Sequence, residues 1–428
     1  MVDIFLANTS EDYAERLEMQ GLAGVQAAHE MDLSNRSLLY GGGRKIVVLP
    51  TNVDAAWVRN TCSSIGYSDL TILIPSNTSL RLCRSIERDG VLLERLASIL
   101  RSNPSSRLIP YAVTKEYCSL CRALELSDPS VSHAAAIQMD SKAEFRMAFQ
   151  DTAVRMPRGY VCEELSQVVT RLMEFSEVGT PAVLKVHDGE SGWGMEIFDW
   201  LAQADKRDKR QIDKAVKEIV SADLVWSHGP YIVEEYIVPS SKLSALSPSG
   251  EGTVSSSGTS LDYICDQVIA ADGTFIGIRM GRSIQELPLT SVVAERTIQV
   301  GQRLQEMGYE GSYDVDFIVG DEGLYALESN VRRTGGTHVY EVAKHCFGDD
   351  WTSRSFISND SISYGEHSLN GDEIYRRLGD ILFDAAEGSG IIVSYISSRR
   401  PMIGVIGVGK NDHEAIGFLQ RVSELLRH

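Results

Sequence analysis

The chain has 428 residues and a formal net charge of −18, and 43% of its residues are hydrophobic. This length and composition predict about two to four domains with filled hydrophobic cores. Because nucleic acids and anionic membrane surfaces attract excess positive charge, the negative balance argues against both as non-specific partners. An anionic small molecule would need a local basic site.

The 7 cysteines are scattered and odd in number, which does not fit a disulfide framework. Cys118 and Cys121 form a lone CxxC in an apolar run, so we interpret them as buried helical thiols rather than zinc ligands. The N-terminus lacks the basic start and apolar stretch of a signal peptide, and no apolar run of about 18 residues could span a membrane. These features predict a cytoplasmic protein.

The first third of the chain alternates between apolar and amphipathic segments. Residues 1–40 are predicted to form an amphipathic helical lead-in. Lys45–Pro50 and Leu70–Ile74 are compact apolar runs typical of buried strands, with a helix beginning near Asp54 and a long helical pattern over Leu80–Leu100. This strand–helix order predicts a parallel α/β sheet.

A lysine and a glycine-rich loop form the first candidate phosphate site. After a helix N-cap at Asp140 or Ser141, an apolar strand within Pro181–Met195 carries Lys185 and runs into the loop Gly189–Gly194. Glycines let backbone N–H groups approach phosphate oxygens, and the lysine adds a positive charge. The lysine precedes the glycines, so this is not a Walker loop. An ordinary strand followed by a hairpin is the alternative interpretation.

The next segment combines acidic residues with a stretch of low complexity. Gly229–Val238 is predicted to be a strand, and Glu234 and Glu235 in its middle lie either on an exposed edge or toward a ligand. Residues 240–260 are rich in Ser and Gly, which predicts a mobile loop. Because a loop of this length inside a domain is usually functional or disordered, we expect it to form a flap over the site.

Two further strands are predicted within Ser260–Met280, around the turn Ala271–Gly273. The second strand carries Arg279. A helix is predicted over Ser291–Met307. Arg279 is thus a cation on a predicted strand that precedes the hairpin described next.

That motif is a hairpin in which Val315–Val319 and Leu324–Leu327 flank a turn rich in Asp and Gly. Five side chains lie on or just after it: Asp316, Glu328, Asn330, Arg332 and Arg333. Glu328 and Asn330 are two residues apart, so both point to one face of a strand. Two carboxylates and an amide oxygen suit a hard cation such as Mg²⁺, and the adjacent guanidinium groups suit a phosphoryl group. The alternative is an exposed acidic hairpin with no ligand.

Two motifs near the C-terminus are weaker. The order of His338, Glu341 and His345 does not fit the zinc-protease spacings. Gly404–Asn411 fits GxxxxGK but has Asn411 where a P-loop needs Ser or Thr for Mg²⁺. We therefore predict a strand that leads into a helix cap at Asn411 or Asp412.

Taken in this order, the motifs resemble the ATP-grasp superfamily over about residues 140–345. Lys142 resembles the first nucleotide lysine of that family, Pro181–Met195 resembles the strand and phosphate loop of D-alanine–D-alanine ligases, and Ile232–Ile237 resembles the hinge that binds adenine through backbone groups. The resemblance implies nucleotide-binding roles for Lys142, Lys185, Gly189, Glu190, Ser191, Gly192, Gly194, Glu234, Glu235, Tyr236 and Ile237.

The hairpin resembles the metal-binding part of the same family. The resemblance implies that Asp316, Glu328 and Asn330 hold Mg²⁺, with Mn²⁺ as a substitute. It implies that Arg332, in the ExNxR pattern, and Arg279 stabilise developing charge. It implies substrate-side positions at Arg333, Thr334, Gly335, Gly336 and His338. One departure is Asp314, which stands where the family often has a basic residue, and another is the absence of the usual ribose-binding acid near residues 240–242.

The resemblance implies an α/β architecture: an ATP-grasp fold with an N-terminal α/β pre-ATP-grasp domain and a small C-terminal α/β extension. The expected domains are residues 1–138, 139–345 and 346–428, with two subdomains of the middle domain clamping ATP. The C-terminal stretch VSYISSRRPMIGVIGVGKNDHEAIGFL is similar to the peptide ligases of pheganomycin-type biosynthesis.

The expected activity is therefore an ATP-dependent carboxylate–amine ligase that forms a peptide or other amide bond through an acylphosphate, in peptide natural-product biosynthesis. Its partners would be a carboxylic acid and an amine or peptide, without nucleic acid or membrane, and a homodimer is the family expectation. Two alternatives stay open, namely a small-molecule kinase on the same fold and a non-catalytic nucleotide-binding protein.

Overall fold

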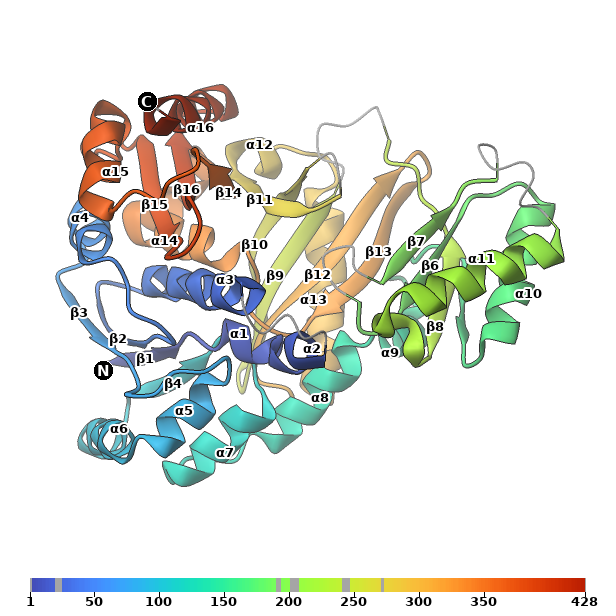
Figure 1. The fold of residues 1–428 in the computed structure, drawn as a ribbon, viewed down its shortest axis with the longest axis horizontal. Helices are drawn as coiled ribbons and strands as arrows, with labels where there is room; N and C mark the ends of the chain where they lie inside the picture. Colours follow the sequence, from blue (N-terminus) through green and yellow to red (C-terminus); the bar gives the residue numbers. More distant parts are fainter. Residues whose placement is uncertain are drawn as a thin grey trace. The chain divides into compact units, whose positions relative to one another are not determined.

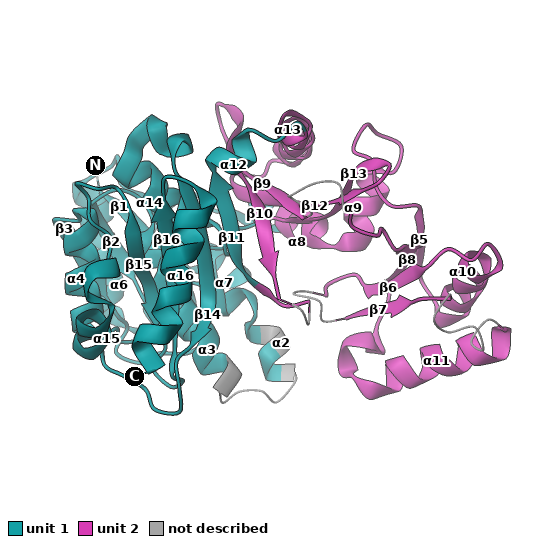
Figure 2. Ribbon diagram, turned by 90° about the horizontal axis from the view of Figure 1, so that it is seen from above, with its two compact units in different colours: residues 1–133, 276–288, 332–428 teal, residues 134–275, 289–331 magenta. Residues whose placement is uncertain are grey.

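The computed structural model describes residues 2–19, 25–189, 194–200, 208–240, 247–270 and 273–427. The chain forms two compact units, coloured separately in Figure 2. Unit 1 comprises residues 1–133, 276–288 and 332–428, and unit 2 comprises residues 134–275 and 289–331. The N-terminal region and the expected C-terminal extension thus belong to the same unit. The division into three domains remains a prediction.

Unit 1 contains a four-stranded parallel sheet in the order β3-β2-β1-β4. Its strands are β1 (Asp3–Leu6), β2 (Arg44–Val48), β3 (Asp69–Leu73) and β4 (Arg107–Pro110). The parallel sheet and the strands β2 and β3 confirm the prediction. The helical lead-in over residues 1–40 is wrong at its start, because β1 is an inner strand of the sheet. A run of four residues has little local signal, and its pairing with β2 and β4 decides its conformation.

Further strands of unit 1 pair antiparallel in the order β11-β14-β16-β15. They are β11 (Phe275–Gly281), β14 (Ser355–Ser363), β15 (Gly390–Ile396) and β16 (Met402–Gly409). After β16, the Asn411 carboxamide accepts a hydrogen bond from the Glu414 amide at 3.0 Å and caps helix α16 (Asp412–Arg427). This confirms a strand and a helix cap at Gly404–Asn411.

The other helices of unit 1 surround these strands in Figure 1. They are α1 (Thr9–Asp12), α2 (Ala14–Met19), α3 (Val25–Ser34), α4 (Ala55–Ile65), α5 (Leu82–Arg88), α6 (Gly90–Ser102), α7 (Lys115–Ala123), α12 (Arg282–Gln285), α14 (Thr337–Phe347) and α15 (Gly371–Leu378), with the 3-10 helices η1 (Asn35–Leu39), η4 (Gly348–Ser353) and η5 (Gly379–Ile381). The helical pattern over Leu80–Leu100 is divided into α5 and α6, because Asp89 caps α6 by accepting a hydrogen bond from the Leu92 amide. Helix α8 (Ser130–Asp140) contains the boundary between the units.

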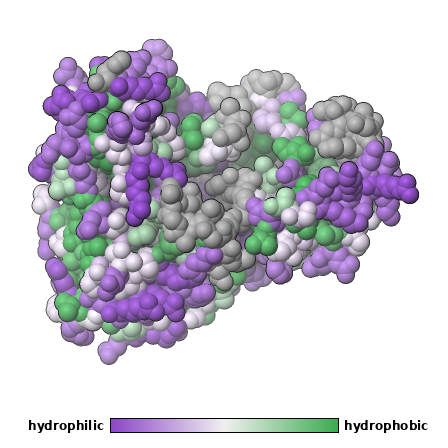
Figure 3. All heavy atoms as spheres, in the orientation of Figure 1, coloured by the Kyte–Doolittle hydropathy of each residue, from purple (hydrophilic) through white to green (hydrophobic). Residues whose placement is uncertain are grey.

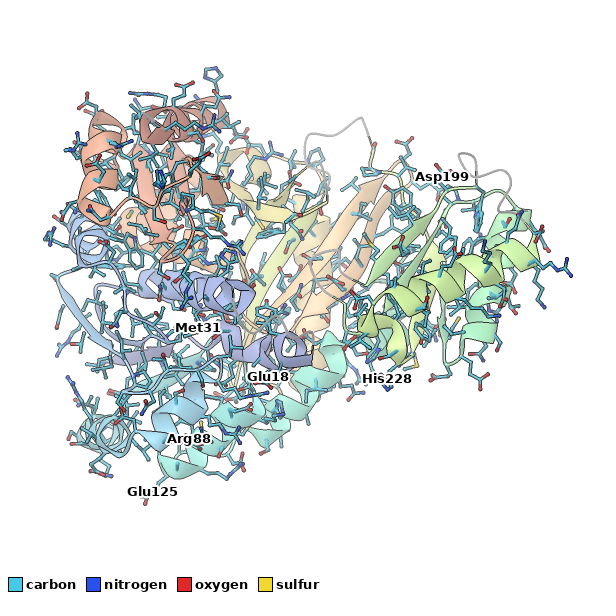
Figure 4. All side chains as sticks on the ribbon, viewed as in Figure 1. Glu18, Met31, Arg88, Glu125, Asp199 and His228 are labelled. Carbon is cyan, nitrogen blue, oxygen red and sulfur yellow. The ribbon has the colours of Figure 1, made fainter. Side chains whose placement is uncertain are left out.

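Unit 2 has a small antiparallel sheet in the order β5-β8-β6-β7. Its strands are β5 (Gly159–Cys162), β6 (Ala182–Val186), β7 (Met195–Phe198) and β8 (Tyr231–Glu235). Asp199, labelled in Figure 4, follows the end of β7. Helices α10 (Leu165–Glu177) and α11 (Lys209–Ala222), green in Figure 1, contribute Phe175, Ile212 and other apolar side chains to the core on one face of this sheet.

The longer strands of unit 2, called its larger sheet below, have the order β13-β12-β9-β10. Its strands are β9 (Pro248–Ser255), β10 (Gly258–Ile269), β12 (Gly311–Gly320) and β13 (Gly323–Asn330), and the unit also contains α9 (Lys142–Phe149) and α13 (Thr290–Glu306). The hairpin and the helix predicted around residues 291–307 are confirmed.

The mobile flap predicted over residues 240–260 is wrong from Pro248 onward, because this stretch forms β9 and the start of β10. Residues 241–246 lie outside the described residues. The glycines that suggested a loop serve close packing, since a Cβ at Gly250 would lie 2.2 Å from Thr297 Oγ1 on α13. Pairing on both sides and a helix against one face override the low strand propensity of Ser and Gly.

The distribution of hydrophilic residues and the burial of the cysteines fit what the composition predicted. Hydrophilic residues, purple in Figure 3, are spread across the face drawn there. Cys118 and Cys121 are buried on α7, as predicted. In the described part of the chain, no helix is long and apolar enough to cross a lipid bilayer.

Candidate functional site

Lys142 is the first residue of α9, where the Ser141 hydroxyl caps the helix. Its amide donates to the His187 carbonyl at 2.9 Å, and its ammonium group donates to the Gly189 carbonyl at the start of the predicted phosphate loop. The same ammonium group pairs with Glu328 on β13 at 2.6 Å. Lys142 therefore links the two sheets of unit 2 and places a cation between the loop and the hairpin.

Lys185 and Glu234 lie on one face of the small sheet, because Lys185 pairs across strands with Ile232, two residues before Glu234. The Lys185 ammonium group lies 2.5 Å from Glu234, and Arg146 on α9 donates to the other oxygen of the same carboxylate. Burial pushes the Glu234 pKa upward, but the two cations outweigh it and hold that pKa below its usual value. Gly159 permits this arrangement, since a Cβ there would lie 2.6 Å from the Glu234 Cβ.

The two faces of this small sheet differ in chemistry. Ala182, Leu184 and Val186 point into the helix-covered core, whereas Lys185 alternates to the opposite face. Met195 pairs with Lys185 across β7 and is 42% exposed. The face that carries the cation is thus uncovered at its apolar edge, which suits a ligand with both a flat apolar part and a negative charge.

The predicted phosphate loop is only partly described. Glu190, Ser191 and Gly192 lie outside the described residues. Gly194 has a φ of +75°, and its carbonyl accepts a hydrogen bond from the Val186 amide at 2.9 Å, which closes the base of the loop. Nucleotide-binding roles for Gly189 and Gly194 remain predictions.

The predicted adenine hinge leaves β8 at Glu235. The Glu235 and Tyr236 amides already donate to the carbonyls of Arg158 and Pro181. Backbone recognition of adenine in this segment, which remains a prediction, would therefore use carbonyl groups or the Ile237 amide.

Asp316, Glu328 and Asn330 converge on one face of the larger sheet. Asp316 lies directly opposite Glu328 in the β12–β13 pairing, and the Asn330 side-chain amide donates to Asp316 Oδ2 at 3.0 Å. A β-bulge follows between Asp316 and Phe317. The alternation of side chains along the strands and the strand pairing thus bring together the three oxygen-bearing side chains that the sequence of the hairpin predicted to lie together.

A third carboxylate, Asp314, lies on the same face and is 2% exposed. It accepts hydrogen bonds from Asn330 and from the Ser249 hydroxyl, and Gln267 donates to Asp316. Burial, followed by the neighbouring Asp316 charge, raises the Asp314 pKa well above its ordinary value. Burial and then Glu328 raise the Asp316 pKa to about 6. The carboxyl groups of this face therefore resist ionising together, and a bound cation would favour their ionised forms.

The donor set fits a hard cation. Carboxylate and amide oxygens are the ligands that Mg²⁺ accepts, usually together with substrate phosphates. Among the described residues no three His, Cys, Asp or Glu side chains are placed to enclose an ion by themselves. Two carboxylates and an amide supply only part of the oxygen ligands of such an ion, so the remaining ligands would come from a bound molecule or water.

Arg332 and Arg333 lie in unit 1, next to the end of β4. Arg332 forms an isolated bridge with Ala112, and the Arg333 amide donates to the Tyr111 carbonyl at 3.0 Å. The Arg332 guanidinium group lies 2.9 Å from Asp12 and is close to the Tyr13 ring.

Arg333 has different partners. Its guanidinium group lies 3.1 Å from Glu341 on α14 and faces the Tyr40 ring at 4.9 Å. The two neighbouring arginines are thus each matched by a separate carboxylate.

The remaining substrate-side candidates begin α14. The Thr334 amide donates to the Thr337 hydroxyl at 2.9 Å, which closes a turn through Gly335 and Gly336. His338 is 1% exposed, and burial and then Arg36 lower its pKa well below the ordinary value, so the ring is neutral. Its Nε2 atom lies 3.7 Å from Asp360.

Arg279 lies on β11 of unit 1. Its guanidinium group is 3.3 Å from Asp412 at the start of α16. This contact gives Arg279 a structural partner, and its catalytic role remains a prediction.

Sequence reasoning missed Arg146, Ser249, Gln267 and Asp12 as partners of the candidate residues. Ser249 fell in the segment predicted to be a loop, and Asp12 is separated from Arg332 by more than half of the chain. Asp314 was visible as a departure from the family pattern, and its alternation with Asp316 placed it on the same face. The sequence could not show which donors that face would meet.

Comparisons with known proteins agree with this fold. Residues 34–126 match the family described as Pre ATP-grasp domain. The L-propargylglycine–L-glutamate ligase of Streptantibioticus cattleyicolor is 25% identical over 292 residues, which are 65% of this chain and 58% of that protein. The match thus spans a little over half the length of this relative.

Two solved structures share the fold. The biotin carboxylase–β,γ-ATP complex from Campylobacter jejuni has a TM-score of 0.58 at 13% identity, covering 99% of this chain and 91% of that one. The biotin carboxylase domain of the Hydrogenobacter thermophilus 2-oxoglutarate carboxylase, a dimer with MgADP and bicarbonate, has a TM-score of 0.56 at 12% identity, covering 99% and 89%. The matched domain and the shared fold thus show a pre-ATP-grasp domain and an ATP-grasp fold in this chain.

Proposed function

We propose that the protein is an ATP-dependent carboxylate–amine ligase that forms an amide bond through an acylphosphate. The observation that carries this proposal is the convergence of Asp316, Glu328 and Asn330 on one sheet face, with the Lys142 ammonium group 2.6 Å from Glu328. Oxygen ligands beside a cation, on an ATP-grasp fold, suit a nucleotide triphosphate held with a metal ion.

ATP would lie between the two sheets of unit 2. Lys142 and Lys185 would neutralise its phosphates, with backbone N–H groups of the loop Gly189–Gly194. The exposed edge of this face at Met195 would receive the base, next to the segment that ends at Ile237. Arg146 would act indirectly, since it shares Glu234 with Lys185 and so fixes the lysine.

The chemistry has two steps. An oxygen of the substrate carboxylate attacks the γ-phosphorus of ATP, the bond to the β–γ bridging oxygen breaks, and ADP leaves. The amine nitrogen then attacks the acyl carbon, the carbon–oxygen bond to phosphate breaks, and the nitrogen loses a proton. Asp316, Glu328 and Asn330 would hold Mg²⁺, with Mn²⁺ as a substitute, and the ion supplies charge neutralisation at the terminal phosphates when bound.

Arg332 would stabilise negative charge on the phosphoryl group and the acyl oxygen, and Arg279 would be a second candidate for this role. The substrates would bind near Arg333, Thr334, Gly335, Gly336 and His338. The relative named L-propargylglycine–L-glutamate ligase supports an amino acid as substrate. A peptide substrate and a role in natural-product biosynthesis are proposed from the resemblance of the C-terminal stretch. The dimeric neighbour supports a homodimer.

Isotope transfer tests the reaction. The acid substrate is labelled with ¹⁸O in its carboxylate, and the released phosphate is analysed by mass spectrometry. We expect one labelled oxygen per phosphate, because the acylphosphate step moves a carboxylate oxygen to phosphorus. Candidate pairs of an amino acid and an amine are screened first for ADP release. Unlabelled phosphate from an active pair would exclude the acylphosphate.

The same screen separates the kinase alternative. A kinase needs one hydroxyl acceptor and keeps the phosphoryl group on its product. Free phosphate that appears only when both an acid and an amine are present supports the ligase. ADP release with a single acceptor and no free phosphate would identify a kinase.

A further inference from the structure

The hydrogen bonds around Asn330 fix the orientation of its side-chain amide. The Asn330 Nδ2 group donates to Asp314 Oδ1 at 3.1 Å and to Asp316 Oδ2 at 3.0 Å. If the amide were turned over, its oxygen would face two carboxyl groups, whose ionised forms only accept hydrogen bonds. The nitrogen end is therefore tied to β12, and the amide oxygen is turned away from both carboxyl groups.

Asp314 is itself held in place from the opposite side. Its other oxygen, Oδ2, accepts a hydrogen bond from the Ser249 hydroxyl on β9. Asp314 is 2% exposed and Ser249 is 4% exposed, so water does not compete for these groups. The contacts form a row across three neighbouring strands, from Ser249 through Asp314 to Asn330.

We propose that Asp314 is a positioning residue for the metal site, which orients the Asn330 amide so that its oxygen faces the ion. The inference rests on the proposed function, because it needs Asp316, Glu328 and Asn330 to bind a metal. It assigns a role to the position at which the chain departs from the family pattern. Groups that orient a metal ligand through a hydrogen bond typically change metal affinity by about 10- to 100-fold when they are removed.

Two substitutions at Asp314 separate orientation from charge. Asp314→Leu removes both acceptor atoms and keeps a similar side-chain length. Asp314→Asn removes the charge but keeps one oxygen that can accept from Asn330 while its nitrogen turns toward Ser249. An orienting role predicts a large loss for the leucine variant and near recovery for the asparagine variant, whereas a purely electrostatic role predicts a loss for both.

The readout is Mn²⁺ affinity, measured by electron paramagnetic resonance titration of the full-length protein with ADP present. We expect the dissociation constant to rise about 10- to 100-fold for Asp314→Leu and to stay within about threefold of wild type for Asp314→Asn. ADP binding without metal, measured by calorimetry, should be unchanged in both variants.

Glu251 offers a matched control. It lies directly opposite Asp314 in the β9–β12 pairing, is also 2% exposed, and accepts a hydrogen bond from the Tyr263 hydroxyl at 3.1 Å. Glu251→Met therefore removes a buried carboxylate of the same sheet face, and we expect less than a threefold change in Mn²⁺ affinity. If Asp314→Leu does not fold, Ser249→Ala tests the same row, with an expected loss of up to about tenfold.

The outcomes separate this inference from the proposed function. Wild-type protein that binds no Mn²⁺ with ADP overturns both. Wild-type binding with an unchanged constant in Asp314→Leu overturns only the positioning role, as does an equal loss in Asp314→Leu and Glu251→Met. Equal losses in Asp314→Leu and Asp314→Asn would assign the effect to charge and also overturn it.

Discussion

The acidic hairpin of unit 2 and the arginine pair of unit 1 differ in whether their charged side chains have partners of opposite charge. On the hairpin face, Asp314 and Asp316 lie close together, and their hydrogen-bond donors Ser249, Gln267 and Asn330 are uncharged. In unit 1, Arg332 and Arg333 each have a carboxylate of their own. The hairpin face therefore has acidic groups that would gain from a bound cation, whereas the charges of the arginine pair are already matched by carboxylates.

This difference indicates what each surface should bind. Buried carboxylates with raised pKa values favour a cation, because an added positive charge restores their ionised form. Arginines that are already paired favour a ligand only if it can replace the protein carboxylate, so they suit anionic groups with two oxygens. Substitutions on either surface can break this contrast, and the largest effects are expected on the hairpin.

Replacing an oxygen ligand on the hairpin should have the largest effect. We expect Asp316→Asn to lower kcat for ADP release by about 10²- to 10³-fold, since it removes charge where the metal and phosphates would meet. Steady-state kinetics at saturating Mg²⁺ measures it, with circular dichroism as the control for folding. A variant that retains more than half of wild-type kcat would show that Asp316 is not part of the site.

On the balanced surface, Arg332→Met should lower kcat by about 10²-fold through loss of a charge-stabilising group. Arg332→Lys should fall between this variant and wild type, because an ammonium group keeps the charge but not the planar pair of donors. Arg333→Lys, at the adjacent arginine, should raise KM more than it lowers kcat. The same kcat loss at both arginines would contradict the separate roles.

The acidic groups of the hairpin should make the stability of the metal-free protein depend on pH. The Asp316 pKa of about 6 lies above the ordinary value of 3.8, so its contribution is favourable below about pH 4 and is lost as the pH rises to about 6. Two pKa units correspond to about 3 kcal/mol as an upper limit. Thermal unfolding between pH 4 and 7.5 should show a smaller decline for Asp316→Asn than for wild type.

Adding Mg²⁺ and ADP at pH 7.5 should restore part of the lost stability in wild type and less in the Asp316→Asn variant. Parallel pH profiles for the two proteins would show that Asp316 does not titrate in this window.

The smallest effect should come from removing the carboxylate that pairs with Arg332 in unit 1. Asp12→Asn removes an ionised partner of the buried Arg332 guanidinium group, and we expect the free energy of unfolding to fall by about 1–3 kcal/mol. Urea unfolding measures this change, and Asp3→Asn, at a more exposed ion pair with Arg107, is the control, with a change below about 1 kcal/mol. Equal changes in both variants would show that the Asp12–Arg332 pair has no special weight.

Local sequence patterns predicted much of this molecule. The apolar runs of β2 and β3, the Asn411 cap and the hairpin with Asp316 and Glu328 were confirmed, because each depends on contacts within a few residues. The patterns failed for β1 and for the Ser- and Gly-rich β9. Both are strands because they are paired on each side, β1 with β2 and β4, and β9 with the adjacent β10 and with β12, which lies further along the chain.

By itself, the sequence determined which groups are available for chemistry: the lysines Lys142 and Lys185, the hairpin oxygens and the two arginines. The alternation of side chains along a strand also fixed which hairpin residues share a face. Only the tertiary structure decided their partners, such as Asp12 for Arg332 and Ser249 for Asp314. Strand period and turn chemistry act over a few residues, whereas burial and ion pairing depend on segments that meet only when the chain folds.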